Sequence, residues 1–415
     1  MGNGSLAAAF LIYSLLLFQV SSTASLQNPH LVVQDVNSRK NASSVAVAGA
    51  PALGRKLLKS SSSSGGGSKT GNPIDDCWRS DPDWASNRGR LADCAVGFGK
   101  GAKGGQEAAG NPYVVDNDGD DVNNPEPGML RHAVIQPGPT WIIFARDMTI
   151  KLKDELVVIH PFKTIDGRGV DVHIAGGPCL NVHATHNFIL HGVSIHDCQV
   201  GGNERIGDAG FFQRSDGDGI QVFQSSDVWI DHCYFSNAVD GLVDVIAGST
   251  AVTISNNRFT DHNKVMLLGQ SDQGHDTNMK VTVAYNVFGE GLTQRMPRCR
   301  QGYFEVVNNY YPSGWHEYAI GGSSNPTIKS QGNVFVAPSD GDHLEVTSRE
   351  DVPESEYKGW NWVSEGDKMV GGAFFVPSGA DSSSSVYAKA SSMVAQPAEA
   401  VPDITRNAGP FKDLK

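Results

Sequence analysis

Short stretches in which β-branched or aromatic residues alternate with polar ones recur through the second half of the chain. Alternation with a period of two is typical of a strand, and clusters of Gly, Asn, Asp or Ser follow each stretch. A repeat of this length indicates units that bury their apolar faces only against their neighbours. The pattern therefore predicts an all-β chain folded as a single-stranded parallel β-helix, with asparagines stacked in an internal ladder that bonds the turn backbones. Four stretches, VTISNNRF, VTVAYNVF, FEVVNNYY and IKSQGNVF, carry these residues at intervals of 23 to 29 positions, at Asn257, Asn286, Asn309 and Asn333.

The same repeat places charged side chains on neighbouring coils. If VWIDHCYF, VTISNNRF and VTVAYNVF are equivalent strands starting at residues 228, 252 and 281, Asp240 and Lys264 each follow their strand start by twelve residues. Arg295 follows its own strand start by fourteen residues. Adjacent coils have the spacing of paired strands, about 4.8 Å. We therefore expect Asp240 and Lys264 to lie side by side, with Arg295 on the next coil of the same row.

Two aspartates compete for the coil before Asp240. Asp216 precedes it by the same interval that separates Asp240 from Lys264, whereas Asp218 shares with it an Asp-Gly-aliphatic pattern, DGI against DGL. The repeat leaves this choice open, and both side chains should lie near Asp240. Asp244 follows Asp240 by an even number of residues, so its side chain returns to the same face of an extended strand.

The resulting group holds three or four carboxylates together with Lys264 and Arg295, and Arg298 and Arg300 are close by in RMPRCR. Carboxylates at such distances repel one another unless a cation lies among them. Hard oxygen ligands from separate coils, with room for water, favour Ca²⁺ over Mg²⁺. A solvated row of acids and bases that neutralise one another on a sheet face is an equally weighted alternative.

The overall charge narrows the range of partners. Lys and Arg total 33 against 45 Asp and Glu, which gives a formal net charge of −12 at pH 7. Because phosphate binding needs an excess of basic residues, this balance argues against a nucleic-acid partner.

Residues 1–71 differ in composition from the rest of the chain. An apolar run over 6–20, followed by small residues up to Ala24, predicts a signal peptide over 1–24, and therefore secretion with no membrane association after cleavage. The run is shorter than the roughly 20 residues that a membrane-spanning helix needs. Residues 25–71 are polar, end in Ser and Gly tracts and contain an N-glycosylation sequence at Asn41, so we interpret them as a propeptide or flexible spacer.

Residues 72–379 have the composition of one globular domain. Its last part, 354–378, is aromatic and is expected to pack on the coils, because the ends of a solenoid need a cover. The Ser-, Ala- and Pro-rich residues 380–415 predict a mobile, low-complexity tail.

Secretion makes disulfides plausible for the six cysteines of the chain. Cys233 stands where the other repeats carry the recurring asparagine, so we expect a buried thiol there, and Cys299 is a second candidate for a free thiol. The remaining four are near one another in sequence as two pairs that would each close a short loop, Cys77 with Cys94 and Cys179 with Cys198.

Three further residues suggest chemistry but are interpreted as structural. Asp231 and His232 in WIDH, and His262 in DHNK, could form a metal site or an acid–base pair. Single histidines on strands are more often held by structural hydrogen bonds, and the chain has no Cys and His spacing typical of zinc.

The motifs together resemble those of plant pectate lyases. The resemblance runs from about Asn72 to Gly379. It is carried, in family order, by NPIDDCWR, LADCAVGFGK, LRHAVIQ, WIIF, KTIDGRG, DGDGI, WIDH, DGLVDV, GSTAVTISNN, NKVMLLG, QRMPRCR, YAIGGSSNPTI and GWNW with SEGD.

The resemblance implies a right-handed parallel β-helix that cleaves de-esterified pectin by Ca²⁺-dependent β-elimination. The family commonly has His in place of Gln270 and Asn in place of Cys233, and the stretch Gly201–Ser215 is unlike the usual sequence. By position, the family's calcium ligands match Asp216, Asp240 and Asp244, with Asp218 as a possible further ligand; its substrate-binding residues match Lys264 and Arg300, with Arg298 nearby; and the arginine that acts as base matches Arg295.

Two other functions remain as alternatives. Polygalacturonases share the β-helix and hydrolyse pectin with carboxylates as acid and base, and a non-catalytic wall protein would bind pectate through Ca²⁺ alone. We expect a secreted monomer of the cell wall that acts on pectate.

Overall fold

The computed structural model describes residues 69–202, 214–272, 274–349 and 352–411, together with the backbone of 205–206 and 210–211. The chain divides into two units, Met1–Ala50 and Pro51–Lys415, and every described residue belongs to the second. The expected signal peptide and Asn41 lie outside the described residues. No helix within the described ranges is long and apolar enough to cross a membrane.

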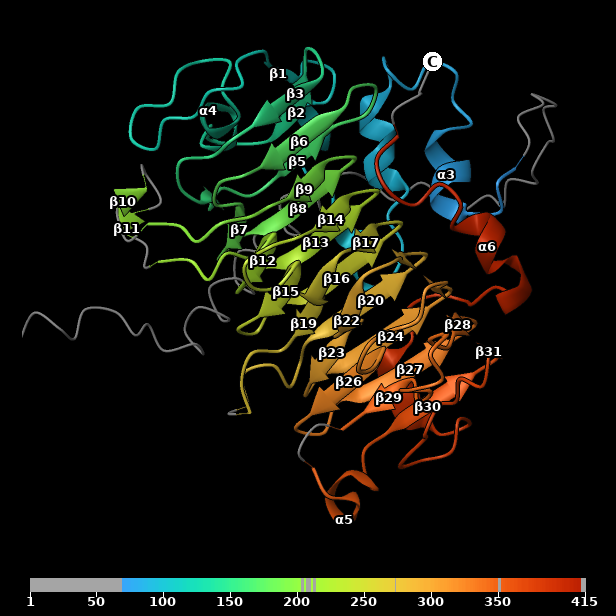
Figure 1. Cartoon of the computed structure of the whole chain (residues 1–415). Coiled ribbons are helices and arrows are strands. Elements are labelled where there is room, and N and C mark those ends of the chain that lie inside the picture. Colours follow the sequence, from blue (N-terminus) through green and yellow to red (C-terminus); the bar gives the residue numbers. More distant parts are fainter. Residues whose placement is uncertain are drawn as a thin grey trace, which may run out of the picture. The chain divides into compact units, whose positions relative to one another are not determined.

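Three long parallel sheets make up the structure, which confirms the predicted parallel β-helix (Figure 1). The ten-stranded sheet contains, in order, β1 Tyr113–Val115, β2 Thr140–Phe144, β5 Lys163–Asp166, β8 His186–His191, β13 Ser226–Asp231, β16 Thr250–Ser255, β20 Lys280–Ala284, β24 Tyr303–Val307, β27 Thr327–Gln331 and β30 Trp362–Glu365. The nine-stranded sheet contains β3 Met148–Ile150, β6 Val172–Ala175, β9 Ser194–His196, β14 Tyr234–Ser236, β17 Arg258–Thr260, β21 Val287–Phe288, β25 Tyr310–Tyr311, β28 Val334–Val336 and β31 Lys368–Val370. The eight-stranded sheet contains β4 Leu156–Val158, β7 Leu180–His183, β12 Ile220–Phe223, β15 Val243–Ile246, β19 Met266–Leu268, β23 Arg298–Arg300, β26 Ile320–Ser323 and β29 Thr347–Ser348.

Each turn of the coil gives one strand to each sheet, passing from the eight-stranded to the ten-stranded and then the nine-stranded sheet. The repeat alignment is confirmed, because Val228, Val252 and Val281 are direct partners on neighbouring strands. Two smaller sheets pair β18 His262–Lys264 with β22 Leu292–Gln294, and β10 Arg205–Ile206 with β11 Gly210–Phe211.

The asparagine ladder lies between the ten-stranded and nine-stranded sheets and is fully buried. Asn257 donates its backbone and side-chain N–H groups to the side-chain oxygen of Asn286, at 2.9 and 3.1 Å, and Asn286 does the same to Asn309. Each side-chain amide also donates to a backbone carbonyl, as Asn286 does to that of Ile254 at 2.9 Å. Cys233 is buried at the start of this ladder, where its backbone N–H donates to Asn257, as its position in the repeat predicted.

A stack of aromatic rings follows the ladder through the core. The centroid distances between successive rings are 4.5 to 5.5 Å and the rings are nearly parallel. The rings add one large apolar side chain per coil, so the core continues from coil to coil. They belong to Phe235, Phe259, Phe288, Tyr311 and Phe335.

The two ends of the stack are covered differently. Helix α4, Leu130–Val134, packs buried apolar residues against the first coils. At the other end, 354–378 supplies the short helix α5, Glu354–Tyr357, and the last strands β30 and β31. This segment packs on the coils as expected, and it also extends two of the sheets.

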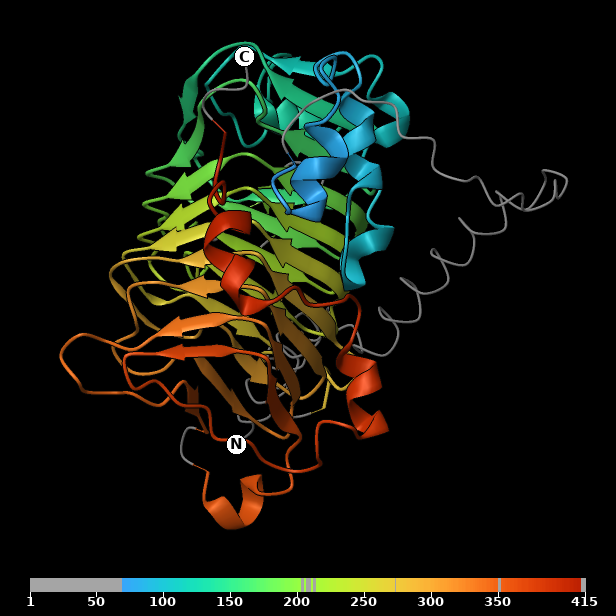
Figure 2. The same ribbon diagram turned by 90° about the vertical axis from the view of Figure 1, so that its right-hand side faces the viewer.

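Two segments from opposite ends of the described chain cover the ten-stranded sheet (Figure 2). The N-terminal one contains α3 Pro73–Trp78, η1 Arg88–Asp93, η2 Phe98–Gly101 and η3 Gln106–Ala108. The C-terminal one contains η5 Ser385–Ala390, η6 Ala398–Ala400 and α6 Val401–Ile404.

The expectation of a mobile tail is wrong for residues 380–411. The backbone N–H of Ser392 donates to Glu305 at 2.9 Å, and that of Gln396 donates to Asn308 at 2.8 Å. The segment 380–411 is poor in large apolar residues, but its backbone N–H groups donate hydrogen bonds to side chains of the coils. The described tail is therefore part of the folded domain.

Both expected disulfides are present, Cys77–Cys94 and Cys179–Cys198, and Cys299 is a buried free thiol like Cys233.

Candidate functional site

The candidate residues gather along the outer face of the eight-stranded sheet. Asp216 and Asp218 precede β12, Asp240 precedes β15, Asp244 lies in β15, Lys264 ends β18, Arg295 follows β22, and Arg298 and Arg300 lie in β23.

Asp240 and Lys264 are in direct contact, as the repeat predicted. The Lys264 ammonium lies 2.6 Å from an Asp240 carboxylate oxygen, and both side chains are partly exposed. On the same short strand as Lys264, His262 Nε2 contacts the backbone carbonyl of Asp240. Burial lowers the pKa of His262, so the neutral ring donates this hydrogen bond. Its role is structural, as interpreted from the sequence, and it fixes the loop that carries Asp240.

The register places neither Asp216 nor Asp218 level with Asp240. Ile220 is paired with Val243, and the same register followed back along both strands brings Gly217 level with Asp240. The backbone N–H of Asp240 accordingly donates to the carbonyl of Gly217. The two aspartates therefore lie on either side of that level. Asp216 is exposed, whereas Asp218 is buried.

Asp218 and Asp244 converge beside Gly241. The backbone N–H of Gly241 donates to Asp218 at 2.7 Å. A Cβ atom on Gly241 would lie only 2.3 Å from Asp244 Oδ1 and 3.2 Å from Asp218 Oδ1, so a side chain there would fill the space that both carboxylates face. Glycine keeps this space open.

Burial and mutual repulsion perturb both carboxyl groups. Burial raises the pKa of Asp218 to about 7, and the charges of Asp216 and Asp240 add to the rise. Burial, with the charges of Asp218 and Asp240, raises the pKa of Asp244 well above its ordinary value, and Arg295 opposes that rise. Lys264 and Arg295 therefore do not supply enough positive charge to hold the buried carboxyl groups in their ionised form.

These residues fit a divalent cation with hard oxygen ligands. Asp244 Oδ1 is buried and has no hydrogen-bond partner among the described residues. Such an orphaned acceptor, in a group of carboxylates that repel one another, is what a bound Ca²⁺ would satisfy. Asp216, Asp218, Asp240 and Asp244 are the residues that would hold it.

The arginines lie on the coils that follow. Arg298 is paired with Leu267, which in turn is paired with Asp244, so all three side chains lie in one row across the strands. Arg300 donates to Ser323 at 3.1 Å and to the backbone carbonyl of Gly269 at 3.2 Å.

Arg295 is held in an unusual backbone conformation. Its φ angle is +64°, in the left-handed region that non-glycine residues seldom adopt. Its carbonyl accepts from Met266 at 2.8 Å, and the next N–H, of Met296, donates to Ala319 at 2.7 Å. Arg295 Nε is buried without a hydrogen-bond partner in the described structure. The same left-handed conformation recurs at turns of other coils, as at Gln224, Ala247 and Tyr285, so at Arg295 it fixes the path of the chain and does not by itself mark a functional position.

Three polar residues beside the carboxylates were not predicted from the sequence. Asn181 donates to Glu155 at 3.4 Å and to Gln221 at 3.5 Å, and Gln221 donates to Asp218 at 3.3 Å. Burial, followed by the charges of neighbouring aspartates, raises the pKa of Glu155 to about 7. For Asn181 and Gln221 the signal was a polar residue at the outward position of LNVH and IQVF, the same position that Asp244 occupies in the next coil.

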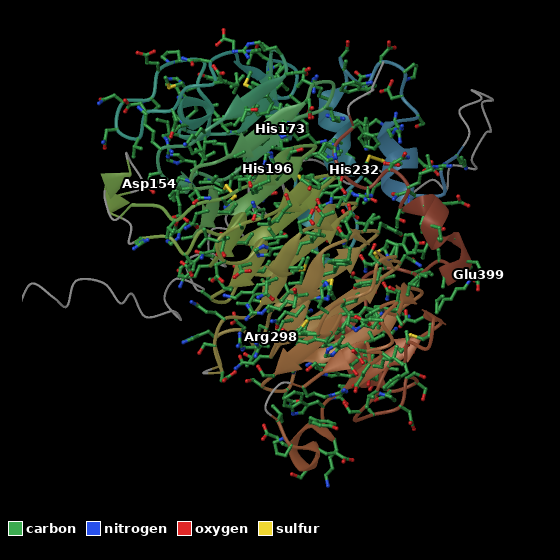
Figure 3. The ribbon with its side chains drawn as sticks, viewed as in Figure 1. Asp154, His173, His196, His232, Arg298 and Glu399 are labelled. Atoms are coloured by element: carbon green, nitrogen blue, oxygen red, sulfur yellow. A yellow bond between two sulfur atoms is a disulfide. The ribbon has the colours of Figure 1, made fainter. Side chains whose placement is uncertain are left out.

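His232 lies away from this site (Figure 3), in contact with Asp231 and with Asp75 of α3. With His191, Asp231 and His232 form a buried group whose ligand atoms could surround a metal ion. His232 instead lies between two carboxylates, 2.6 Å from Asp231 and 3.1 Å from Asp75 of the N-terminal segment. This geometry agrees with the structural interpretation.

Comparison with known proteins identifies the family. A family model described as "Pectate lyase" matches residues 145–412. A probable pectate lyase, number 5, of Arabidopsis thaliana is 56% identical over 408 residues, which cover 96% of this chain and 95% of that protein. A pectate lyase of Zinnia elegans is 54% identical over 396 residues, 94% of each chain.

Solved structures give the same result. The crystal structure of jun a 1, the major allergen from cedar pollen, has a TM-score of 0.77 and 44% identity, and covers 82% of this chain and 99% of its own. A pectate lyase from Bacillus sp. N165 in complex with trigalacturonate shares the fold, with a TM-score of 0.56 and 21% identity over 77% of this chain and 99% of its own. With these relatives covering nearly its whole length, the chain belongs to the pectate lyase family.

Proposed function

We propose that this protein is a secreted pectate lyase that cleaves de-esterified homogalacturonan by Ca²⁺-dependent β-elimination, giving 4,5-unsaturated oligogalacturonates. The observation that carries the proposal is the contact of Lys264 with Asp240 beside the buried pair Asp218 and Asp244, with Arg295 close enough to lower the pKa of Asp244, in a chain of this family. Its substrate would be the polysaccharide of the plant cell wall.

The chemistry needs positive charge around a uronate carboxylate. β-Elimination removes the weakly acidic proton next to that carboxylate and expels the glycosidic oxygen from the neighbouring carbon. Negative charge builds on the carboxylate in the transition state, and Lys264 and Arg300, with Arg298 nearby, would bind and stabilise it. A bound Ca²⁺ would act as a Lewis acid at the same group.

Arg295 is the residue we assign as the base. A guanidinium is charged at ordinary pH and cannot accept a proton in that form. Turnover should therefore increase toward alkaline pH, and an optimum in acid would contradict this role.

The test is an ultraviolet assay of polygalacturonate cleavage, with and without a chelator. We expect product absorbance from the unsaturated ends, its loss in excess chelator, and its return with added Ca²⁺. The matched variant Arg295→Lys keeps the charge but should lower turnover by at least about a hundredfold, the typical contribution of a general base, while oligogalacturonate and Ca²⁺ still bind. Turnover within a few-fold of the unmodified protein would remove Arg295 from this role.

The same assay separates the alternatives. A polygalacturonase would release reducing ends without ultraviolet absorbance, and a non-catalytic wall protein would bind oligogalacturonate without any product. The basic row favours the lyase, because acid–base hydrolysis by two carboxylates does not require it.

A further inference from the structure

The outer face of the eight-stranded sheet changes character from one end to the other. On the coils that follow Asp244 it carries Lys264 and three arginines. On β4, β7 and β12, the outward positions hold no lysine or arginine: they are Val157, Asn181, His183, Gln221 and Phe223. In Figure 3, Asp154 lies toward this N-terminal end and Arg298 toward the basic end.

Two buried acidic residues, preceded by the exposed Lys153, lie near the N-terminal end of this face. Glu155 is almost fully buried beside Asn181, and Asp154 precedes it. Arg131 is close, but it forms an ion pair with Asp120 at 2.6 Å and donates to the backbone carbonyls of Asp154 and Glu155 at 2.6 and 2.7 Å. This buried arginine holds the acidic loop in place and does not present its charge to the face of the sheet.

Beside these polar groups runs an apolar strip, formed by His183, Phe223 and Ile246. The three residues are direct partners on β7, β12 and β15. The rings of His183 and Phe223 are stacked, with a centroid distance of 4.7 Å and an interplanar angle of 5°. Burial lowers the pKa of His183 to about 4, so its ring is uncharged under the conditions of the reaction. Both rings remain partly exposed.

We propose that this half of the face binds galacturonate residues whose carboxyl groups are methyl-esterified, with the ester methyl against the apolar strip. The inference rests on the proposed function, since the esterified residues belong to the same polysaccharide chain that is cut beside Arg295. The basic half binds free uronates. Partly esterified pectin therefore binds in one direction along the sheet, with its esterified residues on the N-terminal half.

Two physical effects favour the ester here. Beyond the reach of the proposed Ca²⁺, a free carboxylate would lie near Glu155 and Asp154 with no lysine or arginine on β4, β7 or β12 to compensate, which is unfavourable for two like charges in a partly buried site. The ester removes that charge, and transfer of its methyl group to an apolar surface is worth roughly a fourfold gain in affinity. The strip therefore selects for esterified over free residues at this end.

One experiment uses the unmodified protein. Homogalacturonan of low, random methyl-ester content is digested, and the position of each ester relative to the unsaturated end is determined by mass spectrometry. We expect esters to be enriched on one side of the cleaved bond and depleted on the other. An even distribution, or exclusion of esters from both sides, would overturn the proposal.

A second experiment changes the strip. Phe223→Arg places a cation between His183 and Ile246 and should lower the ratio of initial rates on partly esterified to fully de-esterified substrate by about fivefold, whereas Phe223→Leu should keep the ratio within about twofold. Val114→Arg, which adds the same charge at an exposed position on β1, is the control. An unchanged ratio in Phe223→Arg would contradict the inference. Absence of ultraviolet product from every substrate would contradict the proposed lyase function itself.

Discussion

Asp244 illustrates how much of the site depends on the surroundings of a single side chain. Its position in the sequence, four residues after Asp240, predicted the face on which it lies. The structure adds that it is buried, that one of its oxygens has no partner among the described residues, and that Gly241 leaves open the space in front of it. Spacing could identify the residue but not its electrostatic state, because burial and the charges of neighbouring coils determine the pKa.

A pH dependence of Ca²⁺ binding follows from this state. Burial raises the pKa of Asp218 to about 7, so this carboxyl group binds a proton below about pH 7 in the metal-free protein. Burial also raises the pKa of Asp244 well above its ordinary value. Ca²⁺ must displace these protons, so its dissociation constant should increase by about tenfold per displaced proton between about pH 8 and pH 6. Isothermal titration calorimetry at several pH values measures it.

The control for this prediction is Asp218→Asn. Asparagine can accept the same hydrogen bond from Gly241 but cannot titrate, so Ca²⁺ should bind more weakly and with one proton fewer in the pH dependence. A slope unchanged from that of the unmodified protein would show that Asp218 does not take part in the linked proton release.

At the scale of elements, the repeat predicted more of the structure than any motif did. The recurring asparagines indicated the coil length, and the alignment of three strands predicted the contact between Asp240 and Lys264. Glu155 could not be found in this way, because it lies before β4 and reaches the site through Asn181, a contact across coils that local alternation does not encode. The choice between Asp216 and Asp218 also needed the observed register, which makes neither of them level with Asp240.

Asn286→Ala tests the contribution of the ladder to stability. The substitution leaves the backbone and side-chain N–H groups of Asn257 and the carbonyl of Ile254 buried without these partners. At about 1 to 3 kcal/mol for each unsatisfied group, the free energy of unfolding should decrease by roughly 3 kcal/mol or more. Equilibrium unfolding in urea measures the change, with the exposed Asn278→Ala as control. A loss below about 1 kcal/mol would show that water or local rearrangement replaces the ladder.

At the scale of the whole molecule, the sequence was least informative about the segments outside the coils. The tail from 380 reads as low complexity, yet residues 380–411 follow the ten-stranded sheet back toward α3. There, Asn407 donates to Asp75 at 3.1 Å, and Phe411 packs on His232 with a centroid distance of 4.5 Å. Composition does not reveal such contacts, because each joins a residue of the tail to a partner that is distant in the chain. His232 is the point at which both segments and the coils meet.

This junction predicts a loss of stability in alkali. Burial disfavours the charged form of His232, but Asp231 and Asp75 outweigh it and raise the pKa to about 9 from an ordinary 6.5. Because the folded-state value is the higher one, the stabilisation is fully present below about pH 6.5 and is lost as pH rises through about 9, by up to about 3 kcal/mol. Urea unfolding across this range should show the decrease in the free energy of unfolding.

The variant His232→Gln is uncharged at every pH, so its stability should be lower at neutral pH and this pH dependence should disappear. The control variant His196→Gln, in the surface pair with Asp197, should retain the pH dependence. If His232→Gln kept the full alkaline decrease, another group would be responsible. The proposed base requires alkaline pH for turnover, so the conditions that favour catalysis at Arg295 are those that weaken the attachment of both terminal segments.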